Sequence, residues 1–160
     1  MKHLLLTTIA AVVLVGCGES VPDISIHDAI VLGGDIEAVK QHLADGADVN
    51  ATDEVGWTPL HRAVIGSHTD HTETAEFLIA SGADVNARNA IGWTPLFYAA
   101  AKTGSGHKEI GELLIASDAD VNALSVNGKT PLDWANDEIA ALLRKHGGKT
   151  KKELEAEAKK

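Results

Sequence analysis

The stretch GWTPLH, residues 56–61, decides the fold, because close copies of it follow at a fixed interval. The chain contains GWTPLF at residues 92–97 and GKTPLD at residues 128–133, so each copy begins 36 residues after the one before. A second phrase, GADVNA at residues 46–51, returns at residues 82–87 and once more in altered form, with the same step. Two markers that share one period predict stacked repeats, in which a single unit cannot bury its apolar face alone.

Each Thr-Pro-Leu triplet predicts the start of a helix. Threonine is a good N-cap, and a proline at the first helical position loses no needed hydrogen bond. We therefore expect helices to begin after Thr58, Thr94 and Thr130. Gly46 and Gly82 lie where the end of a helix favours a left-handed residue. The polar, glycine-containing segments before the triplets predict tight hairpin-like loops.

These phrases resemble the ankyrin repeat, and the resemblance covers residues 24–148. It implies an all-α solenoid of about four helix-turn-helix units with hairpin-like loops. The usual repeat has 33 residues, so the spacing of 36 places three extra residues between the two helices of the middle units. The expected units are residues 24–52, 53–88, 89–124 and 125–148. The first is atypical and the last is shortened, as terminal capping units are.

Residues 1–16 predict a bacterial lipoprotein signal peptide. A basic start precedes an apolar run of 12 residues, which is too short to span a bilayer but suits a secretory signal. The following LVGC, residues 14–17, resembles the lipobox of bacterial lipoproteins. That resemblance implies cleavage before Cys17, acylation of its thiol and a lipidated linker at residues 17–23. The alternatives are an uncleaved signal, or a plain secretory signal followed by an incidental cysteine.

The residues beside Cys17 bear on location. Gly18 and Glu19 follow it in place of an aspartate at the second position. By the sorting rule of enteric bacteria, this implies a lipid-anchored protein of the cell envelope, in the outer membrane and facing the periplasm. Because Cys17 is the only cysteine, we expect no disulfide, cysteine-ligated zinc or cysteine nucleophile in the mature domain.

The charge of the chain restricts its partners. It carries 14 Lys and Arg against 23 Asp and Glu, and residues 18–148 alone carry 8 and 20, a net charge of −12. Because nucleic-acid binding depends on neutralising phosphates, this acidity argues against it and favours a basic or neutral protein partner. Residues 149–160 form a charged C-terminal tail, expected to be a solvated, fraying helix or a disordered end.

The sequence predicts no catalytic site and no cofactor. It contains no glycine-rich phosphate loop, nucleophile elbow or HExxH pattern. The resemblance implies that His61 hydrogen-bonds the turn region. His68, Asp70 and His71 could bind zinc or copper, although a polar, solvated loop is the simpler interpretation. The asparagines of the second phrase recur with the repeat, which indicates a structural role.

The resemblance also implies a binding surface on the concave side, formed by hairpin tips and first helices. The matching tip positions are Glu54, Val55 and Trp57, then Ala90, Ile91 and Trp93, then Val126, Asn127 and Lys129. The two tryptophans either pack across the bases of their hairpins or form a binding hot spot. Val55 and Ile91 are apolar where loop tips are normally polar, which indicates an adhesive ridge.

A second aligned set lies two residues after each triplet leucine and comprises Arg62, Tyr98 and Trp134. These large side chains either fill the groove between units or form an exposed binding stripe. The stripe is favoured for Arg62 and Tyr98, and capping of the core for Trp134.

Together these features predict a monomeric, non-catalytic interaction module tethered to an envelope membrane by lipid. Three alternatives stay open: an inhibitor or immunity-type lipoprotein that blocks an envelope enzyme or toxin, a metal-handling lipoprotein that uses His68 and His71, and a passive tether that binds no protein specifically.

Overall fold

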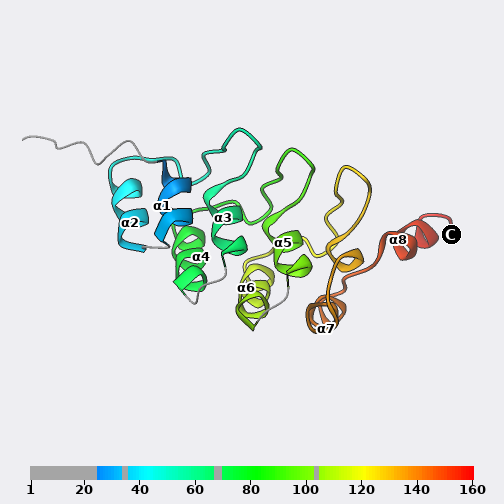
Figure 1. The fold of residues 1–160 in the computed structure, drawn as a ribbon. Helices are drawn as coiled ribbons and strands as arrows, with labels where there is room; N and C mark the ends of the chain where they lie inside the picture. The colour runs from blue at the N-terminus through cyan, green and yellow to red at the C-terminus, as the bar shows by residue number, and fades with distance from the viewer. Residues whose placement is uncertain (1–24, 34–35, 67–69, 103–104) are drawn as a thin grey trace, which may run out of the picture.

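The computed structural model describes residues 25–33, 36–66, 70–102 and 105–160. They form a row of helix pairs with three long loops along one edge (Figure 1). The paired helices are α1 (Ile26–Gly33) with α2 (Ile36–Ala44), α3 (Pro59–Ile65) with α4 (Asp70–Ala80), and α5 (Pro95–Ala101) with α6 (Ser105–Ala116). A 3-10 turn (Pro131–Asp133), α7 (Asp137–Lys145) and α8 (Lys151–Glu157) complete the described chain. Because these residues contain no strand, the all-α repeat fold is confirmed.

The helices form two layers. α1, α3, α5 and the 3-10 turn contact one another in sequence, and α2, α4, α6 and α7 form a second row that packs against them. The long loops extend from the first row. Within the described residues, no helix has the length and apolar character needed to cross a membrane. Cys17, the expected signal peptide and linker, and His68 lie outside the described residues.

Both layers contribute to one apolar core. The triplet leucines Leu60 and Leu96 are fully buried in the first row, and Leu78 and Leu114 are fully buried in the second. Each such side chain stabilises the stack by about 1.5–3 kcal/mol relative to exposure. The recurring leucines therefore supply the contacts that hold one unit against the next.

The three triplets all begin helical turns, but their threonines are bonded differently. Thr58 accepts from the backbone N–H of His61, and its hydroxyl lies 2.9 Å from the His61 Nδ1. Thr130 forms the equivalent pair with Asp133, although only a 3-10 turn follows. Thr94 makes no side-chain cap bond, and its buried hydroxyl has no partner among the described residues. The residue at the third helical position there is Phe97, which offers the hydroxyl no polar atom.

The expected left-handed glycines are confirmed. Gly46 and Gly82 have φ values of 93° and 92°, and the third unit places Asp118 at the same position with φ 65°. Gly56 is also left-handed, and a Cβ there would lie 3.0 Å from the backbone nitrogen of Ala90 in the next loop. This close approach allows neighbouring loops to touch.

Three asparagines 36 residues apart join successive units, and we refer to Asn50, Asn86 and Asn122 as the asparagine ladder. Asn50 donates to Gly82 O and accepts from Asp84 N. Asn86 makes the same two bonds to Asp118 and Asp120, and Asn122 makes them to Gly147 and Lys149. One amide thus satisfies two backbone groups of the following unit, which confirms the structural role expected from the recurrence.

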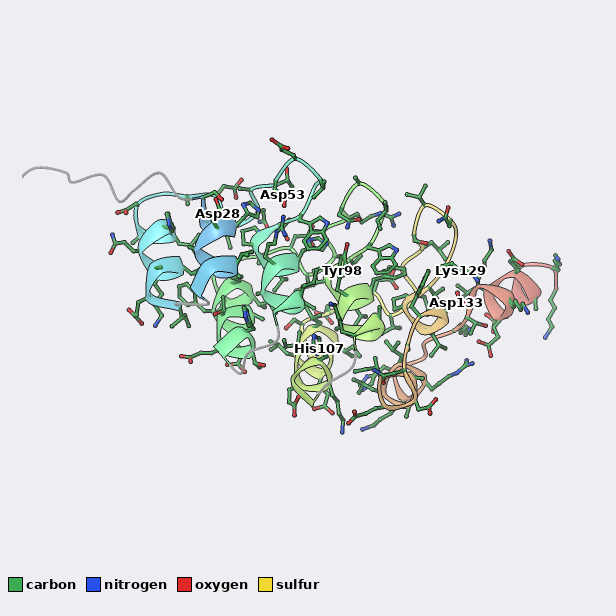
Figure 2. All side chains as sticks on the ribbon, viewed as in Figure 1. Asp28, Asp53, Tyr98, His107, Lys129 and Asp133 are labelled. Carbon is green, nitrogen blue, oxygen red and sulfur yellow. The ribbon has the colours of Figure 1, made fainter. Side chains whose placement is uncertain are left out.

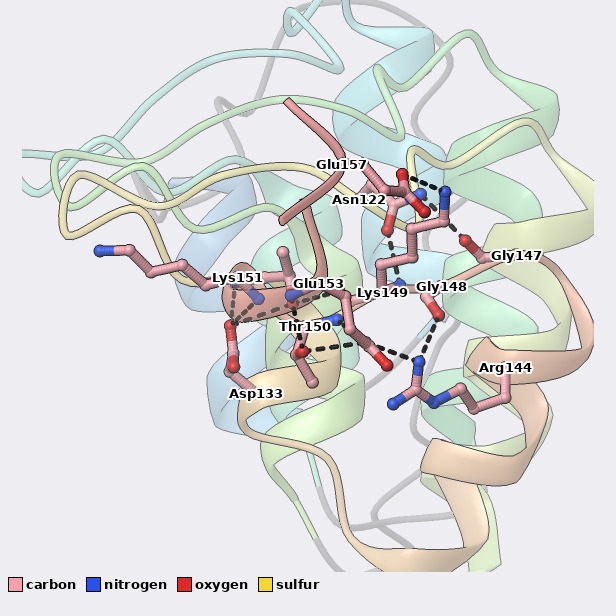
Figure 3. A network of polar contacts seen from close by, with 11 residues as sticks. Asn122, Asp133, Arg144, Gly147, Gly148, Lys149, Thr150, Lys151, Glu153 and Glu157 are labelled. Atoms are coloured by element: carbon pink, nitrogen blue, oxygen red, sulfur yellow. Dashed lines mark hydrogen bonds and ion pairs between the residues drawn. The ribbon is translucent and has the colours of Figure 1, made fainter. Parts of the chain in front are cut away.

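The C-terminal tail is better ordered than expected. α8 begins with a capping box in which Thr150 and Glu153 bond one another's backbone, and Arg144 holds Glu153 at 2.7 Å (Figure 3). The Arg144 guanidinium, followed by the Thr150 backbone and hydroxyl, lowers the pKa of Glu153 to about 2. Of the two expectations, the solvated helix agrees with α8, which buries no residue, and the disordered end was wrong, because contacts with α7 and the last loop hold the tail.

The tail occupies the place of a further unit. Gly148 N donates to Leu143 O, just as Ala83 N donates to Leu78 O in an ordinary unit. Lys149 pairs with Asn122, as the ladder requires, and its carbonyl accepts from the Thr130 hydroxyl at 2.7 Å. Residues 147–157 therefore form a fifth unit that lacks a hairpin loop and places α8 beside the last loop.

Candidate functional site

One side chain at the start of each long loop fixes that loop as a hairpin. Asp53 Oδ1 accepts from the backbone N–H groups of Val55 and Trp57 at 3.0 and 2.8 Å. Asn89 Oδ1 accepts from Ile91 and Trp93 at 3.1 and 2.9 Å in the next loop. Ser125 makes one such bond in the third, from the Lys129 N–H at 3.1 Å. Each loop is thus closed at its base by the residue that begins it.

Backbone hydrogen bonds also join neighbouring loops at their tips. Ala90 N–H donates to the Val55 carbonyl at 3.2 Å, and Val126 N–H donates to the Ile91 carbonyl at 3.0 Å. The three loops therefore form a continuous, braced row.

Large apolar side chains are exposed along this row. Val55, Ile91 and Val126 are 50%, 52% and 69% exposed, and we refer to these three residues as the hairpin ridge. Glu54, Ala90, Asn127 and Lys129 are exposed beside them. These side chains lie outside the hydrophobic core, and their role in binding stays a prediction.

Trp57 and Trp93 lie at the bases of their hairpins. Both are partly buried and pack against the hydrophobic core. This is the packing role expected as one of two interpretations, and truncating either ring would therefore disturb the fold as well as any binding surface. Whether they are also binding hot spots stays a prediction.

Four aromatic rings form a row beneath the ridge, which we refer to as the aromatic row: Trp57, Tyr98, Trp93 and Trp134. Successive centroids lie 4.8, 5.0 and 5.4 Å apart, within the range of favourable aromatic pairs. The row begins under Arg62, whose guanidinium carbon lies 4.5 Å from the Trp57 ring centre. It spans three units, and we refer to the surface that Arg62 and this row form below the loops as the groove; Tyr98 lies near its middle (Figure 2).

Arg62 is held within this groove. Its guanidinium forms a salt bridge with Asp53 at 2.5 Å, and its side chain remains 31% exposed. Partial burial acts to raise the pKa of Asp53, but the N–H groups of Trp57 and Val55 and the Arg62 guanidinium outweigh it. The pKa of Asp53 is therefore lowered, and the pair is charged at neutral pH.

The expectation that Tyr98 belongs to an exposed stripe was wrong. Tyr98 is only 9% exposed, and its hydroxyl accepts from Asn89 Nδ2 at 2.7 Å. Burial raises the pKa of the Tyr98 phenol, and the Asn89 bond opposes this only in part. Trp134 was expected to cap the core. This was also wrong, because the ring is 50% exposed at the C-terminal end of the row.

The structural role of His61 is confirmed. Its Nδ1 accepts from Thr58 N–H at 3.1 Å, and its Nε2 lies 3.0 Å from the Trp93 carbonyl in the next unit. Burial lowers the pKa of His61 more than the Trp93 carbonyl raises it. A neutral imidazole therefore bridges two units.

His71 is buried, whereas a solvated loop was the simpler expectation for this segment. His71 is 5% exposed in the first turn of α4, and a Cβ on Gly66 would overlap its ring. The described residues contain no group of three or more side chains suited to hold a metal ion. Since His68 lies outside these residues, metal binding by His68, Asp70 and His71 stays a prediction.

Asp53 and Asn89 are the groove residues that sequence reasoning missed. Both belong to a repeated spacing of nine residues, from Asp53 to Arg62 and from Asn89 to Tyr98. That spacing, combined with turn-forming residue types, could have indicated that the hairpin and the helix below it are linked.

Stacked helix pairs with braced loops define a repeat protein that presents a continuous surface. The family model described as ankyrin repeats (3 copies) matches residues 26–124 and 67–153, most of the chain. The chain belongs to the ankyrin-repeat family. It is also similar to protein phosphatase 1 regulatory subunit 27 from Homo sapiens and from Mus musculus, with 46% identity over 46 residues in each case. That segment spans 29% of this chain and 29% of each relative.

Proposed function

We propose that the hairpin ridge and the aromatic row below it hold another protein, and that the chain catalyses no reaction. One observation carries the proposal: three large apolar side chains are exposed at successive loop tips that backbone bonds brace into one surface. A preorganised surface loses little freedom on binding, which favours affinity. An interaction module is also what membership of the ankyrin-repeat family indicates.

The chemistry of the groove supports a non-catalytic role. The carboxylate of Asp53 is paired with Arg62, and the amide of Asn89 with Tyr98. His61 uses both ring nitrogens in structural contacts. A general acid or base needs a proton-transfer group directed at substrate, whereas these groups are directed at one another.

We further propose that lipid on Cys17 tethers the chain to the envelope, in the outer membrane and facing the periplasm. The support is the pattern of residues 1–17: basic start, short apolar run and lipobox-like LVGC. Growth of the host with labelled palmitate tests the anchor. Label should appear in the wild-type chain and be lost in Cys17→Ser, which should also leave the membrane fraction.

The binding role is tested by affinity capture from a detergent-solubilised envelope fraction with the full chain as bait. The test bait carries Val55→Ser, Ile91→Ser and Val126→Ser, which alter exposed residues and leave the core intact. The matched control bait carries Val31→Ser, which is 58% exposed on α1. A partner that the wild-type and control baits capture and the test bait does not supports the hairpin ridge as the binding site. A partner kept by all baits moves the site elsewhere, and an empty capture favours a passive tether.

A second candidate is regulation of an enzyme, including the inhibitor or immunity-type role. The observation that favours it is the similarity of a 46-residue segment to a regulatory subunit of protein phosphatase 1. If a captured partner is an enzyme, its activity should change when the purified chain is added. The ridge variant should have no such effect at the same concentration.

A further inference from the structure

The groove below the loops begins at His27, which lies outside the repeated phrases. His27 Nε2 lies 2.9 Å from the Trp57 carbonyl, just as His61 Nε2 lies 3.0 Å from the Trp93 carbonyl. His27 in α1 is therefore the structural equivalent of His61 in α3. The residue that follows it, Asp28, consequently occupies the groove position that Arg62 occupies one unit later.

The α1 end of the groove is acidic. Asp28 is exposed, and among the described residues its carboxylate accepts only from the neighbouring Ser25 hydroxyl, at 2.8 Å. Glu54 is exposed at the first loop tip and forms no ion pair with any other residue that the structure describes. The nearby cation, Arg62, is already paired with Asp53. Two carboxylates at this end therefore lack a compensating charge.

The opposite end of the groove is basic. Lys129 is exposed at the position that Trp57 and Trp93 hold in the preceding loops, and its ammonium makes no ion pair within the described chain. Lys151 of α8 lies beside the same loop, with Nζ 3.3 Å from the Asn127 carbonyl, but it is paired with Glu155 at 3.8 Å, so Lys129 is the cation of this end without an ion pair among the described residues. Figure 2 shows Asp28 and Asp53 toward α1 and Lys129 toward α8.

Besides Glu155, which pairs with Lys151, the acidic group Asp133 lies at the basic end, but its carboxylate is engaged by backbone N–H groups. Its carboxylate accepts from the backbone N–H groups of Thr130 and Lys151 at 2.9 and 3.0 Å. Burial acts to raise the pKa of Asp133, yet these bonds, the Thr130 hydroxyl and the nearby Lys129 lower it overall. Asp133 thus moderates the positive charge there and uses its Oδ2 for bonds within the protein.

We propose that the groove binds a partner segment in one direction only, and that the opposite charges at the two ends of the groove select that direction. The bound segment has an apolar centre on the hairpin ridge, a basic end on Asp28 and Glu54, and an acidic end on Lys129. This inference rests on the proposed function, since it concerns the same surface. Complementary charges at the two ends fix the register and disfavour the reversed placement, which would bring like charges together.

Selection from a phage library of random 12-residue peptides tests this polarity, with the immobilised full chain as bait. Peptides enriched on the wild-type chain should have an apolar centre, basic residues at one end and acidic residues at the other. On the double variant Asp28→Lys, Glu54→Lys both ends of the groove are basic, so the enriched peptides should become acidic at both ends. On Lys129→Glu both ends are acidic, and the enriched peptides should become basic at both ends. All three residues are exposed, and circular dichroism should confirm that each variant remains folded.

Binding of one enriched peptide gives the magnitude. A wild-type-selected peptide should bind each charge-reversed variant about 10-fold more weakly in low salt, and the difference should shrink in high salt. If the enriched peptides carry the same end charges on all three baits, the proposed direction of binding is wrong. If those peptides still depend on Val55, Ile91 and Val126, the proposed function stands without it. If no bait enriches peptides that depend on these residues, the ridge fails as a binding surface and the inference fails with it.

Discussion

Asn89 and Tyr98 tie a loop to the helix beneath it: the asparagine Nδ2 donates to the phenol oxygen at 2.7 Å while its Oδ1 holds the hairpin backbone. Asp53 and Arg62 form the same link one unit earlier, with a salt bridge in place of the neutral bond. A single residue at the start of each of these loops therefore sets both the shape of the loop and its position over the groove.

Removing the hydrogen bond between Asn89 and Tyr98 should lower the free energy of unfolding, and the loss should depend on both residues together. Tyr98→Phe should lower the free energy of unfolding by about 1 kcal/mol, because it leaves a buried amide without its partner. Asn89→Ser retains a hairpin acceptor of the kind that Ser125 provides. Urea unfolding of both single variants and the double variant should show a coupling energy of about 1 kcal/mol. Additive effects would mean that the pair contributes no specific interaction.

Two of the N-cap threonines, Thr94 and Thr58, should respond in opposite ways to substitution by valine. Thr94→Val should raise the free energy of unfolding by up to about 1 kcal/mol, because it removes a buried hydroxyl that has no partner among the described residues. Thr58→Val is the matched control and should lower stability by about 1–2 kcal/mol, since Thr58 caps α3. Thermal or urea unfolding distinguishes the two, and an equal loss at both positions would contradict the assignment.

Breaking the asparagine ladder should weaken the stack at one junction. Asn86→Ala should lower the free energy of unfolding by about 1–2 kcal/mol, because it removes two hydrogen bonds to the next unit. Asn127→Ala is the control, since this exposed asparagine has no such role, and its effect should stay within about 0.5 kcal/mol. Hydrogen exchange should also show faster exchange on the C-terminal side of the altered junction. A loss at Asn86 no larger than that at Asn127 would count against the ladder.

Acidification should destabilise the fold through its histidines. Burial lowers the pKa of His61 and of His107, and the Lys102 charge lowers that of His107 further. Since the unfolded chain takes up protons first, near pH 6.5, stability from these groups is complete above that pH and is lost as the pH falls through the folded values. The lowered pKa values of Asp53, Asp133 and Glu153 act in a separate window, below about pH 4.

His107 offers a direct test of this dependence. Its Nε2 is buried without a partner among the described residues. His107→Leu should therefore leave stability at pH 7.5 within about 1 kcal/mol and reduce the loss between pH 7.5 and pH 5.5. Urea unfolding at the two pH values measures the difference. A loss identical to that of the wild-type chain would show that His107 does not contribute.

The local rules of the sequence predicted one part of this molecule well and another poorly. Helix starts at the triplets and left-handed Gly46 and Gly82 follow from short-range chemistry within the repeat, and the hydrogen-bonding role of His61 was implied by the family resemblance. The burial of Tyr98 does not follow from such chemistry, because it depends on Trp57 and Trp93 from two different units enclosing the same ring. Spacing within one unit carries no information on such a contact.

The C-terminal tail illustrates the same limit. Its composition of lysine and glutamate predicts a solvated end, since it has little apolar surface to bury. Its order instead comes from backbone groups of Lys149 that match acceptors and donors on Asn122 and Thr130. Hydrogen-bond complementarity of this kind leaves no signature in hydropathy or charge.

Because of the asparagine ladder, each unit joins the next through the same contacts, so one unit could take the place of another. Each joint uses a side chain on one unit and only backbone atoms on the next, and the last joint accepts a unit that has no hairpin at all. A duplicated block of 36 residues, such as a second copy of residues 83–118, would therefore meet its neighbours through joints that already exist. The length of the surface can change by gain or loss of whole blocks while every junction keeps the same chemistry.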